Sequence, residues 1–156
     1  LDTDATRYSE AFEDAVTAAA SLVCAVPPDV SAEVALVRPQ PGQGSGELVR
    51  ARGRESALMT LASVNAQPLS PEDQGRVVER SFRSETVIAI LQGWDPGRAA
   101  LIDVLRRRAE GRVLVAVMRE PGSASLVELP CLRGDQLERD LRDFLARASL
   151  ETPKAA

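Results

Sequence analysis

Histidine is missing from this sequence, lysine occurs once, at Lys154, and aromatic residues make up only 3% of the 156 residues. Without histidine the chain cannot form a Ser-His-Asp or Cys-His catalytic site, a histidine-ligated zinc site or an imidazole proton shuttle. The low aromatic content means that the core must be built from leucine, valine, isoleucine and alanine. These absences close many hydrolase mechanisms, and they favour a protein that is not an enzyme.

Cysteine and long apolar runs are also scarce. Cys24, in an expected helix, and Cys131, in an expected loop, form no CxxC pair, so both are predicted to be reduced thiols. No run reaches the length of a transmembrane helix, which predicts a soluble domain. The formal net charge of −4 argues against a general nucleic-acid binder, because such proteins need a basic surface to displace counterions from phosphate.

The stretch 85–117 carries the clearest structural pattern, in which two apolar runs flank an amphipathic helix. The runs 86–91 and 113–117 are unbroken and rich in β-branched residues, as in strands that are buried on both faces. Between them, Asp95 can cap a helix that has Pro96 at its first position. The stretch therefore predicts a βαβ unit with parallel strands and a right-handed crossover.

The rest of the chain alternates in the same way. Helices are predicted at 10–26, 55–64, 71–82 and 135–148, and strands at 34–37, 48–50 and 125–129. Ser70 is predicted to cap the third helix and Asp135 the last one, while Ala62 is expected to face inward. Segment 41–46 is expected to be an exposed loop.

This alternation predicts the α/β fold class, with a three-layer, doubly wound and mainly parallel sheet. We expect one domain over residues 1–150 and a flexible tail at 151–156. The chain starts without methionine, and Leu1 has the character of the end of a strand whose body lies upstream. We therefore expect an excerpt from a longer protein.

Two loops fall where strands of such a sheet end, which is where open parallel sheets bind ligands. In the first loop, Asp2, Asp4 and Thr6 place oxygen atoms at alternating positions, and these atoms would suit Mg²⁺ or Ca²⁺. The second loop contains Trp94 and Asp95. The simpler interpretations are that Asp2 and Asp4 are solvated or cap the first helix, and that Asp95 is only an N-cap. Trp94 is either an exposed anchor for a partner or packed under the central strand.

Several segments together resemble a known bacterial family. They are Leu1-Asp2-Thr3, the helical segment 12–22, the strand 34–37 and the strand 87–91 with its arginine-ended helix. They resemble the C-terminal half of the family filed as domain of unknown function 58, whose members carry a von Willebrand factor A-like domain. Members are often encoded beside MoxR-type AAA+ ATPases and tend to have membrane segments upstream. The resemblance thus implies a Rossmann-like, cytoplasmic domain of a membrane-anchored parent protein.

The same resemblance implies a metal-ion-dependent adhesion site, in which a D-x-S-x-S loop, a threonine and a later aspartate bind a divalent cation that a partner's carboxylate completes. Asp2 matches the first aspartate, Asp4 stands at the first serine, and Thr6 can replace the second. The later aspartate is replaced by Gln92-Gly93, and no middle threonine can be assigned. The implied site is therefore degenerate, with Mg²⁺ bound weakly or not at all.

These observations lead to two hypotheses of different classes. The first is a non-catalytic domain that binds a protein partner, with an AAA+ ATPase as the candidate and with no catalytic residue. The alternative is a Mg²⁺-dependent enzyme or small-molecule binder that uses Asp2, Asp4 and Asp95 at the end of the sheet for phosphoryl chemistry.

Overall fold

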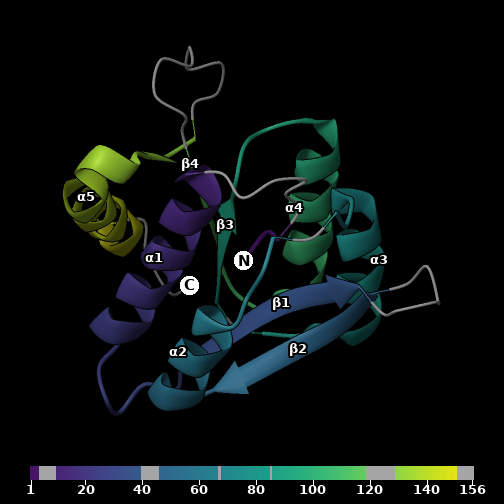
Figure 1. Ribbon diagram of the computed structural model, residues 1–156, viewed down its shortest axis with the longest axis horizontal. Coiled ribbons are helices and arrows are strands. Elements are labelled where there is room, and N and C mark those ends of the chain that lie inside the picture. Colours follow the sequence, from purple (N-terminus) through teal and green to yellow (C-terminus); the bar gives the residue numbers. More distant parts are fainter. Residues whose placement is uncertain (4–9, 40–45, 67, 85, 119–128, 151–156) are drawn as a thin grey trace, which may run out of the picture.

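The computed structural model describes residues 1–3, 10–39, 46–66, 68–84, 86–118 and 129–150, so the predicted tail at 151–156 lies outside the described residues. The elements follow one another as α1 (Glu10–Ala25), β1 (Glu33–Pro39), β2 (Gly46–Arg52), α2 (Arg54–Ala62), α3 (Pro71–Ser81), β3 (Val87–Leu91), α4 (Pro96–Arg108), β4 (Val113–Met118), β5 (Cys131–Leu132), the 3₁₀ turn η1 (Gly134–Gln136) and α5 (Leu137–Leu150). The chain is a mixed α/β protein, as predicted (Figure 1). In the ranges given, no helix is both long and apolar enough to cross a bilayer.

The predicted βαβ unit is formed by β3, α4 and β4. β3 and β4 pair in parallel, with Val87 opposite Val113 and Leu91 opposite Val117. Asp95 and Pro96 start the connecting helix as predicted. The unbroken apolar runs are explained by burial on both faces, which leaves no position of either strand for a solvated polar residue.

The other strands extend this arrangement. β5 pairs in parallel with β4, with Val117 opposite Cys131, so the prediction of a loop at Cys131 is wrong. Two residues are too few to show a strand pattern. The predicted strand at 125–129 lies outside the described residues apart from Leu129. β1 and β2 form an antiparallel hairpin that is longer than the predicted strands, and the loop predicted at 41–46 lies outside the described residues except for Gly46, which opens β2.

The first three residues of the chain lie between the hairpin and the parallel strands. On one side, the Leu1 nitrogen donates to the Ala35 carbonyl oxygen of β1 at 3.0 Å, and the Thr3 hydroxyl donates to the Val37 carbonyl oxygen, also at 3.0 Å. On the other side, the Asp2 N–H donates to the Ile90 carbonyl oxygen of β3 at 2.9 Å. The first three residues and β1 therefore run in the same direction, as in a parallel pair of strands. Figure 1 shows the N-terminus in the interior of the molecule.

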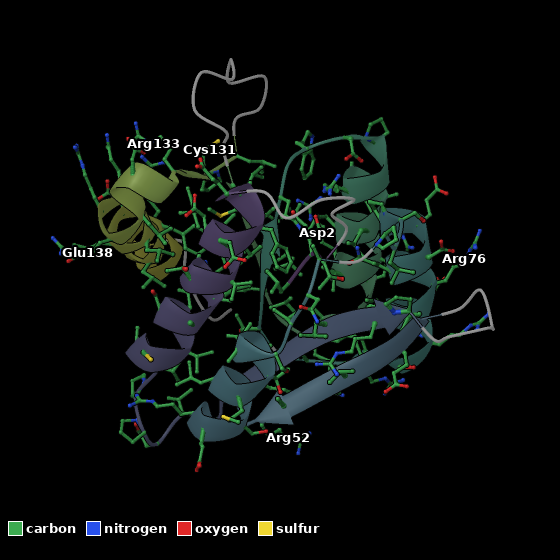
Figure 2. All side chains as sticks on the ribbon, viewed as in Figure 1. Asp2, Arg52, Arg76, Cys131, Arg133 and Glu138 are labelled. Atoms are coloured by element: carbon green, nitrogen blue, oxygen red, sulfur yellow. The ribbon has the colours of Figure 1, made fainter. Side chains whose placement is uncertain are left out.

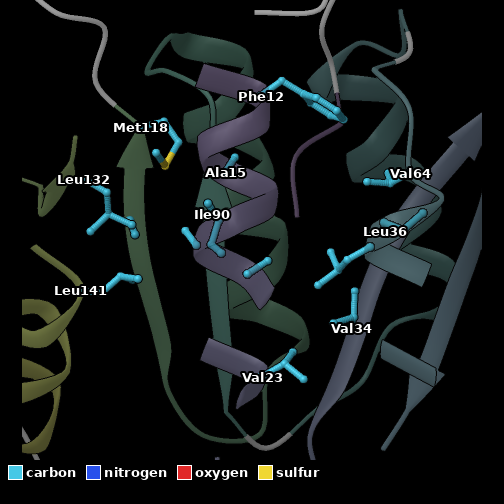
Figure 3. Packing of buried hydrophobic residues seen from close by; sticks show 14 of the residues in the cluster. Phe12, Ala15, Val23, Val34, Leu36, Val64, Ile90, Met118, Leu132 and Leu141 are labelled. Atoms are coloured by element: carbon cyan, nitrogen blue, oxygen red, sulfur yellow. The ribbon is translucent and has the colours of Figure 1, made fainter. Parts of the chain in front are cut away.

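The strands bury apolar side chains on both faces, in two separate clusters. Because successive side chains of a strand point to opposite faces, Ile90 belongs to one cluster and Leu91 to the other. The first cluster joins the strands to α1, α2 and α5, and Figure 3 shows α1 packed across them with Phe12 and Ala15. The second cluster joins them to α3 and α4 through residues such as Val78.

Some predicted helix details are confirmed and others are wrong. Ser70 caps α3, because its hydroxyl oxygen accepts from the Asp73 N–H at 3.1 Å. Asp135 does not cap the last helix, because the chain first makes the 3₁₀ turn η1, in which Asp135 lies. In α2, Leu61 is buried and Leu58 packs against the core, as predicted, but Ala62 is exposed and Ala57 is the buried alanine.

Candidate functional site

Asp2 is the residue around which the candidate site is arranged. Its side chain has 0% exposure, and its backbone pairs with the end of β3. The Gln92 side chain holds the same backbone by donating its Nε2 to the Asp2 carbonyl oxygen at 3.0 Å. Figure 2 shows Asp2 in the middle of the molecule, beside α4. The carboxylate therefore lies at the carboxyl end of the parallel strands, where the sequence predicts ligand binding.

The Asp2 carboxylate accepts hydrogen bonds on both oxygens. Oδ1 accepts from Gln74 Nε2 at 3.0 Å. Oδ2 accepts from the Gln92 N–H at 3.2 Å and from Arg98 Nε at 2.7 Å. A carboxylate is costly to bury unless it is paired with a cation and hydrogen-bonded. These partners from α3, the end of β3 and α4 meet that requirement, and they tie the start of the chain to all three.

Arg98 joins Asp2 to Asp95. Its Nε donates to Asp2, and its Nη1 donates to Oδ2 of Asp95, three residues earlier. The guanidinium side chain is only 13% exposed. Burial alone would lower the pKa of Arg98, but the attraction and hydrogen bonds of Asp2 and Asp95 outweigh it and raise the pKa above its usual value. Arg98 therefore stays charged and is shared by two carboxylates.

Asp95 has two roles in this arrangement. Its Oδ1 accepts from the Arg98 N–H at 2.9 Å, which makes Asp95 the N-cap of α4, as predicted. Its Oδ2 forms the ion pair with the Arg98 guanidinium. Desolvation raises the pKa of Asp95, but the hydrogen bonds from the Arg98 backbone and side chain prevail and lower it. The interpretation of Asp95 as an N-cap alone is therefore incomplete.

Replacing Asp95 should separate these two roles. Asp95→Ala removes the cap and the ion pair and is expected to cost about 1 kcal/mol, whereas Asp95→Asn keeps a capping oxygen and should cost less at neutral pH. Because the folded-state pKa is lowered, the charge of Asp95 stabilises the fold above its ordinary pKa of 3.8, and this contribution is lost as the pH falls through the folded-state pKa. Urea unfolding should show the gap between the original chain and Asp95→Asn closing in acid. A gap that persists would contradict the ion pair.

Gln74 and Arg98 belong to the site but were not singled out from the sequence. Gln74 is 3% exposed and lies on the buried face of α3 with Val77 and Val78. A glutamine three and four residues before buried valines is a usable signal, because a polar group on an apolar face needs a buried partner. Arg98 also carried a signal, because a positive charge in the first turn of a helix is opposed by the helix dipole and so indicates a nearby carboxylate.

The structure brings Asp2 and Asp95 to one end of the sheet through their shared contact with Arg98. The other two predicted metal ligands, Asp4 and Thr6, lie outside the described residues. Within the described ranges, no three His, Cys, Asp or Glu side chains are grouped so that they could hold a metal ion. The arrangement around Asp2 consists instead of nitrogen donors, one of which is cationic.

Trp94 lies beside Asp95 in the connection between β3 and α4. Trp94 is 37% exposed as a residue and belongs to neither core cluster, which favours the exposed alternative over packing under the central strand. An indole that is partly buried and partly exposed keeps a rigid apolar surface available without needing a partner to complete the core. Trp94 therefore adds an apolar contact surface next to the charged residues at the end of the sheet.

Together, these features define the class of the molecule as a mixed α/β protein with a parallel sheet and a buried carboxylate–guanidinium pair at one end of it. Comparison of the chain with protein-family models, with curated protein sequences and with solved structures found no match.

Proposed function

We propose that this chain is a non-catalytic protein-interaction domain with the three-layer architecture of von Willebrand factor A-like domains, and that it binds its partner without a metal ion. The binding surface is the end of the sheet that carries Trp94 and Asp95. The observation that carries the proposal is the Arg98 guanidinium, which lies between the Asp2 and Asp95 carboxylates. It supplies internally the positive charge that a divalent cation brings to a metal-ion-dependent adhesion site.

The arrangement of strands supports this architecture. The first three residues bond to both β1 and β3, which gives the order β2, β1, first segment, β3, β4, β5, with β2 as the antiparallel strand. From the first segment, the chain adds strands on one side and then on the other. The point between that segment and β3 is thus a topological switch point, where ligands bind in doubly wound sheets. Asp2, Trp94 and Asp95 all lie next to this point.

The chemistry of the donors supports a site without metal. A divalent cation beside Asp2 would be repelled by the Arg98 guanidinium, whose Nε is 2.7 Å from Asp2 Oδ2. The cation would also have to displace the N–H groups of Gln74 and Gln92 from the carboxylate. The described residues around Asp2 therefore do not fit the divalent cation that the family resemblance implies.

The charges also favour binding over catalysis. A general acid or base must gain or lose a proton near the working pH. The pKa of Arg98 is raised and that of Asp95 is lowered, so both groups stay charged at neutral pH. Asp2 has 0% side-chain exposure and so presents no surface to a substrate. These properties favour an interaction domain over the alternative of a Mg²⁺-dependent enzyme.

The resemblance to the domain of unknown function 58 family suggests the partner, a MoxR-type AAA+ ATPase. Trp94 offers an exposed aromatic ring, and the side chain of the adjacent Asp95 is 41% exposed. Interfaces between proteins commonly depend on one or two such aromatic anchors within a rim of polar groups.

Magnesium should change neither the stability of this chain nor its binding to the partner. The melting temperature should be the same in EDTA and in millimolar Mg²⁺, because only a ligand of the native state raises stability, by RT ln(1 + [L]/Kd). Binding to a nucleotide-free MoxR-type ATPase, measured by calorimetry, should also be equally tight in both buffers. A Mg²⁺-dependent rise in the melting temperature would contradict the metal-free site and favour the enzyme alternative. The absence of any binding in either buffer would remove the proposed partner.

A further inference from the structure

A cavity of about 540 Å³ lies between β1 and β3, directly behind Leu1. Its two walls are the facing stretches 32–37 and 86–91. Apolar side chains from both core clusters line it as well, among them Val23 from α1, Val78 from α3 and Leu101 from α4. Strand backbones therefore line the cavity on two sides, and apolar side chains from the helices contribute to the rest of its lining.

The facing walls are edges of strands. β1 pairs with β2 along one edge and β3 pairs with β4 along one edge. Their other edges face each other, and in the described part of the chain the first three residues bridge the middle of β1 to the carboxyl end of β3. The edge of a strand presents a row of backbone N–H and C=O groups that can pair with a further strand. This cavity therefore has the shape and the hydrogen-bonding groups of a position within a sheet.

Leu1 fixes the direction in which such a strand would run. Its nitrogen donates to the Ala35 carbonyl oxygen at 3.0 Å, inside the molecule. Desolvation lowers the pKa of this amino group, against an opposing effect of the neighbouring Asp2 carboxylate. A charged ammonium is costly in this position, whereas a peptide N–H making the same hydrogen bond is not. Extending the backbone before Leu1 leads directly into the cavity.

We propose that the cavity is the position of an extended strand that is peptide-bonded to the Leu1 nitrogen, so that the occupant is the segment of polypeptide preceding Leu1. In the register set by Leu1 and Asp2, this strand lies between residues 32–35 and 86–89. The space between those two stretches accommodates about four residues of extended chain, which rises roughly 3.3 Å per residue. Its side chains point alternately into the two core clusters, so all of them are apolar.

The same features decide against a separate peptide. A free strand running parallel to β1 and β3 would place its C-terminal carboxylate beside the Leu1 ammonium, with both charges buried. A peptide bond at this point removes both charges and continues the backbone hydrogen bonding. The first segment would then form the middle of one continuous sheet, instead of a three-residue bridge between two sheets.

Three N-terminal extensions of the full 156-residue chain test this proposal. The first, Val-Val-Leu-Val, supplies apolar side chains and backbone donors. The second, Gly-Ser-Gly-Ser, supplies donors without apolar side chains. The third, Val-Val-Pro-Val, is as apolar as the first but lacks one backbone donor, and proline is excluded from central strands. We expect Val-Val-Leu-Val to raise the melting temperature by about 5 °C or more, Gly-Ser-Gly-Ser to leave it unchanged and Val-Val-Pro-Val to give less than half of the rise.

Amide hydrogen exchange provides the second readout. The Val-Val-Leu-Val extension should slow exchange in β1 and β3, because their facing edges become paired. Equal melting temperatures for the three extensions would overturn the proposal, as would a proline extension as stabilising as Val-Val-Leu-Val. The free peptide acetyl-Val-Val-Leu-Val-amide tests for a separate strand, and sedimentation of the unextended chain tests for a second copy in the cavity. An equal rise with the free peptide, or a dimer with protected β1 and β3, would assign the cavity to another occupant.

Discussion

Arg98→Ala is expected to lower the free energy of unfolding by about 3 kcal/mol or more, because it leaves a fully buried carboxylate without its cationic partner. Asp2 would keep its hydrogen bonds from Gln74 and Gln92 but lose the charge 2.7 Å from Oδ2. Asp95 would lose its ion pair in the same change. Urea unfolding at neutral pH measures the loss.

Arg106→Ala is the matched control, because it removes an arginine from the same helix. The ion pair of Arg106 with Asp103 is 3.3 Å long, and the side chains are 59% and 61% exposed. Such exposed pairs contribute about 0–1 kcal/mol. A loss in Arg98→Ala no larger than that in Arg106→Ala would contradict the role assigned to Arg98.

Millimolar Mg²⁺ should recover part of the stability of Arg98→Ala, because the guanidinium then no longer excludes a cation from Asp2. The same Mg²⁺ concentration should not change the stability of the original chain.

Trp94→Ala is expected to weaken binding to a MoxR-type AAA+ ATPase by roughly 30-fold, which corresponds to about 2 kcal/mol and to the loss of an aromatic anchor. The melting temperature should change little, because Trp94 is 37% exposed and belongs to neither core cluster. Isothermal titration calorimetry with the nucleotide-free ATPase measures the affinity, and a thermal melt of the variant measures its stability.

Met59→Ala provides the control for this measurement. Met59 is 68% exposed and lies on α2, a helix that packs on α1, β1 and β2. Its replacement removes a comparable exposed apolar side chain and should leave the affinity unchanged. Equal losses in the two variants would indicate a general effect of surface hydrophobicity, and no loss in Trp94→Ala would remove the proposed binding surface.

The parts of the fold that could be predicted from the sequence are those set by local chemistry. β3, α4 and β4 were predictable because unbroken apolar runs surround a helix with Asp95 and Pro96 at its start. Ser70 was recognisable as the N-cap of α3 because a serine directly before a proline is also a local signal for the start of a helix. β5 was not predictable, because its two residues are held in the sheet by pairing with β4 and not by a pattern of their own.

The candidate site was predictable only in position. Asp2, Trp94 and Asp95 were identified because they follow expected strands, and the ends of parallel strands meet at one edge. The central contact was not identified, because Arg98 Nε and Asp2 Oδ2 belong to residues that are 96 positions apart. Periodicity relates residues three or four positions apart and says nothing about such pairs. Gln74, which is 72 positions from Asp2, was missed for the same reason.

At the proposed binding surface, the buried Asp2–Arg98 pair would also affect how fast and how tightly a partner associates. Because Arg98 is fixed to Asp2 on one side and to Asp95 on the other, the neighbouring Trp94 is attached to a turn that has little freedom left to lose. Ordering of loops and side chains is a major cost of association, and a turn that is already rigid avoids most of it. Recognition at this surface should therefore resemble rigid docking, with little rearrangement between the free and bound forms.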